Sequence, residues 1–424
     1  MRYQLDRSIE RHGNVVIGGS PLKLFRLTSG GVAVVDRIER GDAVEPSVLV
    51  DRLLDAGAIH PLLVVADEAH RFAATDVTIV VPVHGVLRHA PAGAIVVDDA
   101  SPSPVAGATI RLETNVGAGG ARMAGLEHVT TPLVAFVDSG VTLPDAWLDG
   151  LLPHFDDARV GLVAPRIRST PGASALERYE AQRSPLDLGP EPGRIRAGTR
   201  VSYVPAAALV VRVDAIHQVG GFDIDVRFGE DVDLLWRLDE AGWSCRYEPA
   251  VVARHRPRPT WREWVGQRID YGSSAAPLAI RHPGRLAPVR MSGWSAGSWA
   301  LAAAGHPLAG VAVGASSAAA LVPKLGDVPP RVSLRIAGLG NLHAGRQLAD
   351  AVRRVWWPIV LVAAIRSRRA RLVALASLLP LRHPVHLADD MAYGIGVWKG
   401  VWQERTIAPL IPRFNSWPGR ASAT

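Results

Sequence analysis

The sequence predicts an α/β domain with a parallel sheet, placed between a small N-terminal module of winged-helix type and a helical, apolar C-terminal region. Three observations support this prediction. From residue 76, apolar runs rich in β-branched residues alternate with stretches of helical spacing. Before residue 72 the elements are shorter and begin with a hairpin pattern, and between Arg290 and Lys324 there is no Asp, Glu, Lys or Arg. The predicted domains are therefore 1–72, 76–285 and 286–424.

The composition limits the class of protein. A chain of 424 residues is too long for one ordinary core, which favours two or three domains. With 48% hydrophobic and 21% charged residues, the chain is globular and not disordered throughout. The single cysteine, Cys245, excludes an internal disulfide and a thiolate metal site, and fits a cytoplasmic protein. Residues 1–14 carry charges of both signs and no apolar run, so we expect no signal peptide.

The N-terminal module shows the element order of a small winged helix. Residues 14–28 alternate like a hairpin around Gly18 and Gly19, and residues 29–41 and 45–61 have helical spacing. Winged helices can bind DNA, but residues 27–42 are not basic enough to favour it. The formal charge of +7 is modest for the whole chain, so an anionic substrate or lipid surface is a better expected partner than nucleic acid.

Four apolar runs form the predicted sheet of the central domain, at 76–85, 92–101, 133–140 and 161–167, and residues 117–129 form a helix between two of them. Ligands of such sheets bind at the carboxyl ends of the strands. Asp98, Asp99 and Asp138 lie at such ends. The strand that ends near Pro82 and the adjacent acids Asp98 and Asp99 could accept bonds from a base or ribose, although this pattern is common in α/β proteins.

The segment from Asn115 to Arg122 is the second candidate for nucleotide binding. Asn115 and Gly117 predict a turn, and the small residues that follow let a helix begin close to the sheet. Arg122 lies in the early turns of this helix, where its charge suits a diphosphate. The alternative is a plain glycine-rich helix start.

Asp138 ends a buried strand and is a candidate metal ligand. A second acid two residues later would complete the familiar pair, but that position is Gly140. Glu230 and Asp231 directly follow the turn at Gly229 and open an amphipathic helix. Acids in a first helical turn often only balance the helix dipole, and the alternative is that one of them points into a cleft as a general base.

Taken together, these motifs resemble the family 2 glycosyltransferases with the GT-A fold, over residues 76–285. The resemblance implies a nucleotide-sugar donor and an inverting, one-step displacement assisted by a divalent metal, Mn²⁺ or Mg²⁺. It implies that nucleotide-sugar contacts come from Pro82, Val83, Asp98, Asp99, Asn115, Gly117 and Arg122. It also implies that Asp138 binds the metal and that the Glu230–Asp231 pair supplies the base, with Asp231 as the preferred residue.

His255 is the second metal ligand that the resemblance implies, because a histidine after the last strand has this role in many family members. An imidazole ligand would favour Mn²⁺ over Mg²⁺. The alternative is a basic surface residue. When a diphosphate supplies further oxygens, a metal needs few protein ligands, so the single acid Asp138 can be sufficient.

A narrower resemblance joins the chain to the glycosyltransferases of mycofactocin biosynthesis, on the segments 202–212, 219–238, 247–259 and 267–288. Residues 14–70 are similar to PqqD-like peptide-binding domains. The family implies repeated glucose transfer from a UDP-sugar, in β-1,4 linkage, onto premycofactocin or its precursor peptide. Two alternatives are a processive polysaccharide synthase, whose Gln/Arg-x-x-Arg-Trp motif is not matched by residues 266–272, and a non-catalytic peptide-binding scaffold.

The C-terminal region leaves membrane association open. Residues 291–322 are long enough for one bilayer crossing, but His306–Pro307 divides them into two short halves. Residues 355–365 form a second apolar run with aromatics at one end and arginines on both sides, a pattern typical of a membrane interface. The alternatives are a helical region at the inner face of the membrane and alanine-rich helices that pack on one another.

Overall fold

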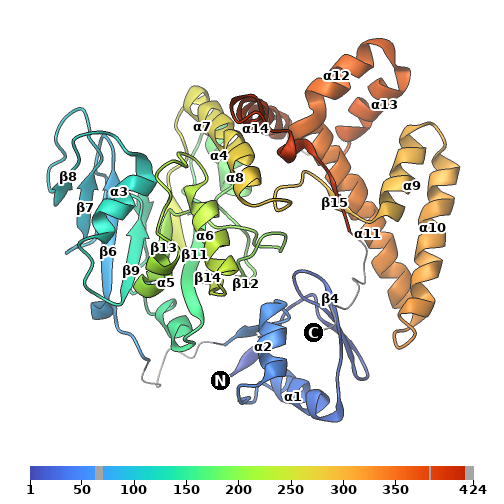
Figure 1. Cartoon of the computed structure of the whole chain (residues 1–424), viewed down its shortest axis with the longest axis horizontal. Helices are drawn as coiled ribbons and strands as arrows, with labels where there is room; N and C mark the ends of the chain where they lie inside the picture. Colours follow the sequence, from blue (N-terminus) through green and yellow to red (C-terminus); the bar gives the residue numbers. More distant parts are fainter. Residues whose placement is uncertain (63–69, 382, 416–424) are drawn as a thin grey trace. The chain divides into compact units, whose positions relative to one another are not determined.

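The computed structural model describes residues 1–62, 70–381 and 383–415 (Figure 1). It separates into two compact units. The first contains residues 1–10, 17–23 and 27–261, and the second contains 11–16, 24–26 and the chain from residue 262 onward. The three domain boundaries given above remain a prediction. Part of the N-terminal module and of the polar link after it, residues 63–69, lies outside the described residues.

The N-terminal segment has the predicted hairpin and two helices. Strand β1 (Tyr3–Leu5) pairs antiparallel with β5 (Ile59–Pro61), and β2 (Glu10–His12), β3 (Val15–Gly18) and β4 (Lys23–Arg26) form a three-stranded sheet. Gly19 turns the chain between β3 and β4 with a positive φ of 84°. Helices α1 (Ser29–Glu39) and α2 (Val48–Asp55) begin at the capping side chains of Thr28 and Ser47.

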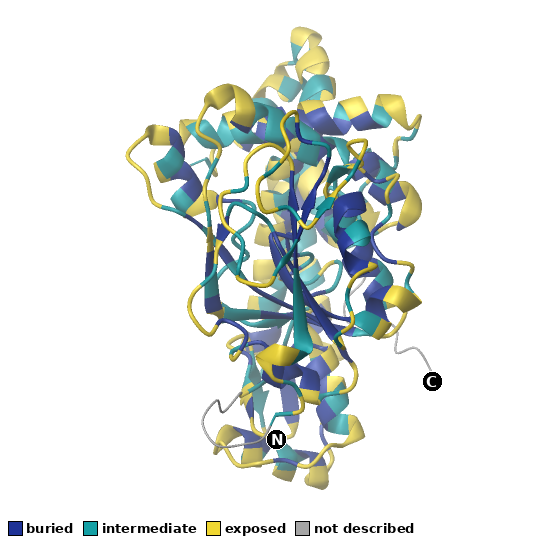
Figure 2. Cartoon of the chain, turned by 90° about the vertical axis from the view of Figure 1, so that its left-hand side faces the viewer, coloured by how far each residue is buried: buried dark blue, intermediate teal, exposed yellow. Residues whose placement is uncertain are grey.

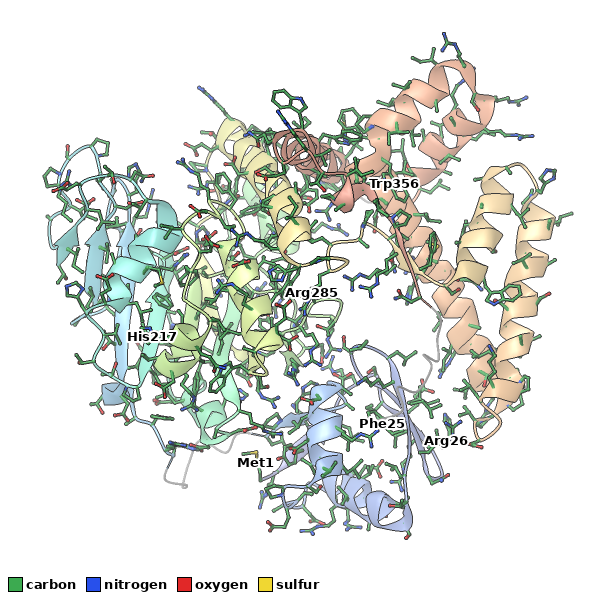
Figure 3. The ribbon with its side chains drawn as sticks, in the orientation of Figure 1. Met1, Phe25, Arg26, His217, Arg285 and Trp356 are labelled. Atoms are coloured by element: carbon green, nitrogen blue, oxygen red, sulfur yellow. The ribbon has the colours of Figure 1, made fainter. Side chains whose placement is uncertain are left out.

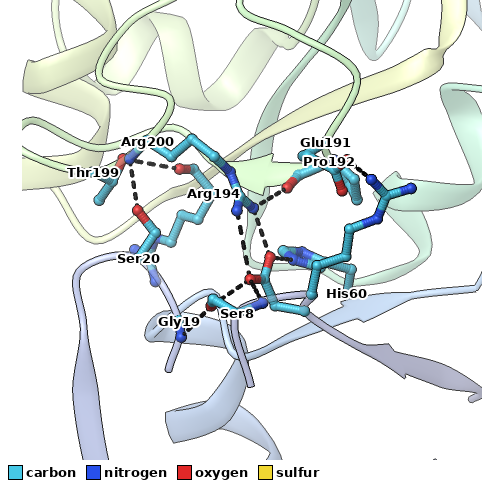
Figure 4. Close-up of polar contacts among 11 residues, drawn as sticks. Ser8, Gly19, Ser20, His60, Glu191, Pro192, Arg194, Thr199 and Arg200 are labelled. Atoms are coloured by element: carbon cyan, nitrogen blue, oxygen red, sulfur yellow. Dashed lines mark hydrogen bonds and ion pairs between the residues drawn. The ribbon is translucent and has the colours of Figure 1, made fainter. Parts of the chain in front are cut away.

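Polar contacts connect this segment to residues 192–200 of the same unit (Figure 4). The buried Asp6 carboxylate lies 2.8 Å from His60 Nε2 and accepts a 2.6 Å hydrogen bond from Arg200. The backbone N–H of Arg200 donates to Ser20 Oγ at 2.6 Å. Because a buried carboxylate is costly without partners, these bonds hold β1 and β5 firmly against the 192–200 loop.

A nine-stranded sheet forms the core of the first unit, in the order β10-β14-β11-β13-β9-β6-β7-β8 with β12 beside β14. Its strands have the following bounds: β6 Val77–Val83, β7 Ile95–Asp98, β8 Ile110–Arg111, β9 Leu133–Val137, β10 Val141–Thr142, β11 Val160–Ser169, β12 Gly193–Arg194, β13 Ala208–Arg212 and β14 Ser244–His255. All four predicted apolar runs are strands. Figure 2 shows the sheet as mainly buried.

The predicted parallel sheet is correct for only part of these strands. β8, β7, β6 and β9 run parallel, and so do β11 and β14. However, β13 is antiparallel to both β9 and β11, and the short strands β10 and β12 pair antiparallel with β14. The sheet is therefore mixed.

Helices pack on this sheet and place the site residues at its edge. α3 (Gly117–Leu126) packs on β6 and β7, α4 (Ala175–Arg183) on β11, α5 (Val213–Gln218) on β13 and α6 (Glu230–Glu240) on β14. A Cβ at Gly125 would collide with Val80 and approach Val97 to 3.2 Å. This glycine therefore permits the close approach of α3 to the sheet that the sequence predicts.

The second unit is mainly helical. Its helices are α7 Trp261–Ser273, α8 Ala275–Arg281, α9 Gly293–Ala303, α10 Pro307–Lys324, α11 Pro330–Ala351, the π-helical turn Val352–Trp356, α12 Trp357–Arg366, α13 Arg368–Ser377 and α14 Pro384–Gln403. β15 (Arg290–Met291) pairs parallel with β16 (Arg413–Phe414). The predicted break at His306–Pro307 separates α9 from α10. Within the described ranges, no helix combines the length and apolar character needed to cross a membrane.

Candidate active site

The sheet edge brings together most of the site residues predicted from the sequence. Asp98 ends β7, and Asp138 follows β9 directly. His255 ends β14, and Glu230 and Asp231 open α6. The carboxyl ends of strands from different parts of the chain thus meet the start of a helix, as expected for a ligand-binding edge of an α/β sheet.

Asp99 caps the start of α3. Its carboxylate accepts hydrogen bonds from the backbone N–H groups of Val116 at 2.8 Å and Gly117 at 3.0 Å, and from Asn115 Nδ2 at 2.8 Å. The first N–H groups of a helix have no partner within the helix, so a carboxylate there satisfies them and balances the helix dipole. The turn predicted at Asn115 and Gly117 is present, and Gly117 has a φ of 80°.

Asp98 organises the loop that follows β7. Its side chain is fully buried and accepts hydrogen bonds from the N–H groups of Ser101 at 2.9 Å and Val105 at 3.1 Å, and from the Arg111 guanidinium. Burial alone would raise the pKa of this carboxyl group, but these donors hold it at about 2. Asp98 is therefore ionised and its oxygens are engaged within the protein.

Pro82 and Val83 lie beside these acids at the end of β6. Pro82 pairs with Val97, and the carbonyl of Val83 accepts a 2.8 Å hydrogen bond from the N–H of Asp99. Both residues are buried. These contacts place both residues at the edge of the sheet. Their contact with a nucleotide, like that of Asp98 and Asp99, remains a prediction.

Arg122 connects the acid after β9, Asp138, with the first acid of α6, Glu230. One guanidinium nitrogen donates to Asp138 Oδ1 at 2.8 Å and the other donates to Glu230 Oε1 at 3.0 Å. The guanidinium also lies over the Phe222 ring, 5.3 Å from its centroid. Burial would lower the pKa of Arg122, but the charges of Asp138 and Glu230 raise it. A buried, permanently charged arginine thus holds the strand-end acid and the helix-start acid together.

Glu230 and Asp231 are a pair of carboxyl groups with raised pKa values. Burial, followed by the charge of Asp231, raises the pKa of Glu230 to about 7, although Arg122 opposes this shift. Burial also raises the pKa of Asp231, whose oxygens accept the N–H groups of Val232 at 2.8 Å and Ala206 at 3.2 Å. Carboxyl groups with raised pKa values in a site are suited to accepting protons near neutral pH.

His255 lies near the turn that begins at Asp138, and the charge of Asp138 acts on its imidazole. Val141 and His255 are paired between β10 and β14, which places the imidazole beside the turn that begins at Asp138. A Cβ built on Gly140 would lie 3.8 Å from His255 Nε2. Burial lowers the pKa of His255, so its imidazole is neutral and can act as a ligand near neutral pH.

The remaining metal positions would have to be filled by something other than protein side chains. Across residues 1–62, 70–381 and 383–415, no group of three or more His, Cys, Asp or Glu side chains is arranged to hold a metal. Asp138 is about one-third exposed, with a side-chain exposure of 35%, and Arg122 engages only its Oδ1. One carboxylate and one neutral imidazole fit a divalent ion whose other ligands are diphosphate oxygens and water.

Several residues of this edge have no distinct sequence signal. His84 Nδ1 lies 2.8 Å from the carbonyl oxygen of Asp99, and Ser101 Oγ accepts the N–H of Gly85 at 2.8 Å. Arg111 reaches Asp98 because the two residues are neighbours on adjacent strands. The two-residue strand that carries Arg111 is too short for a periodicity argument, whereas the polar turn after Pro82 was the available hint for His84.

Comparisons with known proteins identify the family of this chain. The profile of the family described as Glycosyl transferase family 2 matches residues 94–218. The "Pre-mycofactocin glycosyltransferase" of Mycobacterium tuberculosis is 38% identical over 97% of this chain and 97% of its own length. The "N-acetylglucosaminyl-diphospho-decaprenol L-rhamnosyltransferase" of the same organism is 33% identical over 35% of this chain and 51% of its own.

Among solved structures, the mannosyltransferase PcManGT from Pyrobaculum calidifontis, in complex with GDP-Man and Mn²⁺, aligns with a TM-score of 0.41 and 16% identity, over 77% of this chain and 87% of that one. The identity to the mycobacterial relative extends over both the transferase domain and its flanking regions. The chain therefore belongs to the pre-mycofactocin glycosyltransferase family, and its central domain is a family 2 glycosyltransferase domain of the GT-A fold.

Proposed function

We propose that this protein transfers glucose from UDP-glucose onto premycofactocin, with inversion at the anomeric carbon, in β-1,4 linkage and several times in succession. The acceptor is suggested by the printed name of the mycobacterial relative, and the donor and linkage follow from the family resemblance. The observation that best supports transfer chemistry is the buried Arg122, which joins Asp138 to the Glu230–Asp231 pair at one edge of the sheet.

The proposed reaction is one displacement. The acceptor hydroxyl oxygen forms a bond to the anomeric carbon while the bond from that carbon to the diphosphate oxygen breaks, and UDP leaves. Asp231 accepts the hydroxyl proton, because its raised pKa makes it a better base than an ordinary aspartate. Glu230 stays paired with Arg122 next to the base.

Asp138 and His255 are the residues that would hold a divalent metal, which supplies positive charge to the leaving diphosphate. Asp138 Oδ2 and His255 Nε2 would be the ligand atoms, with Mn²⁺ favoured because imidazole is among its ligands. Arg122 keeps Asp138 in place through Oδ1 and adds a fixed positive charge close to the diphosphate. Asp98 and Asp99 would then shape the pocket for the nucleotide base and ribose.

A non-catalytic peptide-binding scaffold is the second candidate function, and the observation in its favour is Gly140, which leaves two protein ligands for a metal. The first proposal is tested by incubating the full chain with the acceptor, UDP-glucose and Mn²⁺ and following the acceptor by mass spectrometry. We expect successive additions of one hexose mass that stop when a chelator removes the metal. Binding of UDP-glucose without any hexose addition would instead favour the scaffold.

The membrane surface, predicted from the composition of the C-terminal region as a further partner, is a separate proposal that rests on other residues.

A further inference from the structure

Helices α12 and α13 form a hairpin whose apolar side chains lie largely uncovered. The two helices pack on each other, yet α12 has no buried residue and α13 buries only Ser377. Six aliphatic side chains are between 53% and 84% exposed: Ile359, Val362, Ile365, Leu372, Leu375 and Leu379. Leu372 and Leu375 are spaced i and i+3 on α13 and so share one face, and Leu379 follows in the turn after the helix ends at Ser377. Apolar stripes of this size on a soluble surface normally mark a contact site.

The hairpin emerges from a well-ordered base. The buried Arg353 donates to Asp390 at 2.9 Å, and Trp398 Nε1 donates to the Val355 carbonyl at 2.7 Å. Trp356, labelled in Figure 3, donates through Nε1 to the Leu410 carbonyl at 2.9 Å. Because these bonds tie the π-helical turn before α12 to the rest of the second unit, the exposed apolar residues belong to a packed element with a defined position in that unit.

Positive charge accompanies the apolar residues. Arg366, Arg368, Arg369 and Arg371 surround the connection between the two helices, and all four are exposed. The sequence contains no Asp or Glu between Asp350 and Asp389. Among the described residues, none of these four arginines forms an ion pair. The hairpin is thus both apolar and strongly cationic.

Exposed aliphatic side chains beside a cluster of arginines fit the surface of an anionic membrane. We propose that the α12–α13 hairpin docks on an anionic lipid surface, with its aliphatic side chains in the interfacial layer and its arginines on the headgroup phosphates. A second copy of this chain is disfavoured as the occupant, because a two-fold contact would bring the same arginine cluster of each copy together. The helices lie on the bilayer, since neither is long enough to cross it. The proposal does not depend on the transferase reaction.

The test uses the full chain in flotation with two kinds of vesicle, phosphatidylcholine alone and phosphatidylcholine mixed with phosphatidylglycerol. We expect binding to the anionic vesicles that is at least about tenfold stronger than to the neutral ones. A variant with Arg366→Gln, Arg368→Gln, Arg369→Gln and Arg371→Gln should lose this preference. The matched control changes four exposed arginines of the first unit, Arg2, Arg37, Arg40 and Arg178, to glutamine and should keep it.

A second variant, Leu372→Ser, Leu375→Ser and Leu379→Ser, separates lipid docking from self-association. Docking predicts weaker flotation at an unchanged molar mass in analytical ultracentrifugation. The proposal is overturned if the unmodified chain does not float with anionic vesicles, or if the hairpin arginine variant binds them as well as its control. It is also overturned if the serine variant changes the molar mass while flotation stays the same.

Discussion

Arg122 donates a 2.8 Å hydrogen bond to Asp138 Oδ1, and this bond fixes the one acid that remains where the family pattern has two. The second position, Gly140, offers no oxygen. Arg122 is buried and reaches Glu230 as well, so a single cation contacts both Asp138, the proposed metal ligand, and the carboxyl pair on α6. Donor binding and proton transfer are therefore expected to respond together when this arginine is changed.

Arg122→Lys should reduce kcat/KM by about 10- to 100-fold, because an ammonium group cannot reproduce the two-pronged contact to Asp138 and Glu230. Arg122 lowers the pKa of the proposed base Asp231 as well as that of Glu230, so a weaker contact should raise both pKa values and shift the pH–activity profile to higher pH. The measurement is kcat/KM from pH 5 to 9. Arg178→Lys, at an exposed position, is the control, and a profile identical to that of the unmodified enzyme would exclude a positioning role for Arg122.

Gly140→Asp should strengthen metal binding. Among the described residues, the one atom within 4 Å of a Cβ built on Gly140 is His255 Nε2, at 3.8 Å, so the new side chain can start without a clash. An added anionic oxygen ligand raises the affinity for a divalent cation. We expect the Mn²⁺ midpoint, measured by calorimetry with UDP present, to fall by about tenfold or more. Gly140→Asn has nearly the same shape without the charge, and equal midpoints for the two variants would place the metal elsewhere.

The sequence was sufficient to predict four strands of the central sheet, helix α3 and the acids at the ends of β7 and β9. Apolar runs with β-branched residues became β6, β7, β9 and β11, and the small residues after Asn115 became α3. These signals are local, since burial on both faces of a strand and close helix–sheet packing each leave a pattern in neighbouring residues. The loss of the second acid at Gly140 could be read directly from the chain.

What could not be predicted depends on contacts between distant residues. The antiparallel direction of β13 is set by its neighbours in the sheet and not by its own composition. The pairing of Arg122 with Asp138 and Glu230, 16 and 108 residues away along the chain, was not predicted. The three internal donors to Asp98 were not predicted either. Side-chain direction at a crowded edge follows from three-dimensional packing, which no local pattern records.

Glu230→Gln should change the pH dependence of stability. The pKa of Glu230 is raised to about 7 in the folded protein, so between its ordinary range and pH 7 the folded state binds more protons than the unfolded state. The stabilisation is fully present at low pH and is lost as the pH rises toward 7, by up to about 1.4 kcal/mol per pH unit. Because glutamine does not titrate, the glutamine variant does not lose this contribution to the free energy of unfolding as the pH rises. Its melting temperature relative to the unmodified protein should therefore increase from pH 5 to pH 8, and a constant difference would contradict the raised pKa.

Asp231→Asn should abolish most of the transferase activity while the fold is retained. Removal of a general base typically costs about 10²- to 10⁴-fold in rate, and the amide can still accept the N–H of Val232 through Oδ1. We expect kcat to fall within this range, the KM for UDP-glucose to change little, and the circular dichroism melt to stay cooperative. Glu240→Gln, at the exposed end of the same helix, is the control and should remain active. If Asp231→Asn keeps full activity and Glu230→Gln does not, the proton acceptor is Glu230, the neighbouring carboxyl group that is bonded to Arg122.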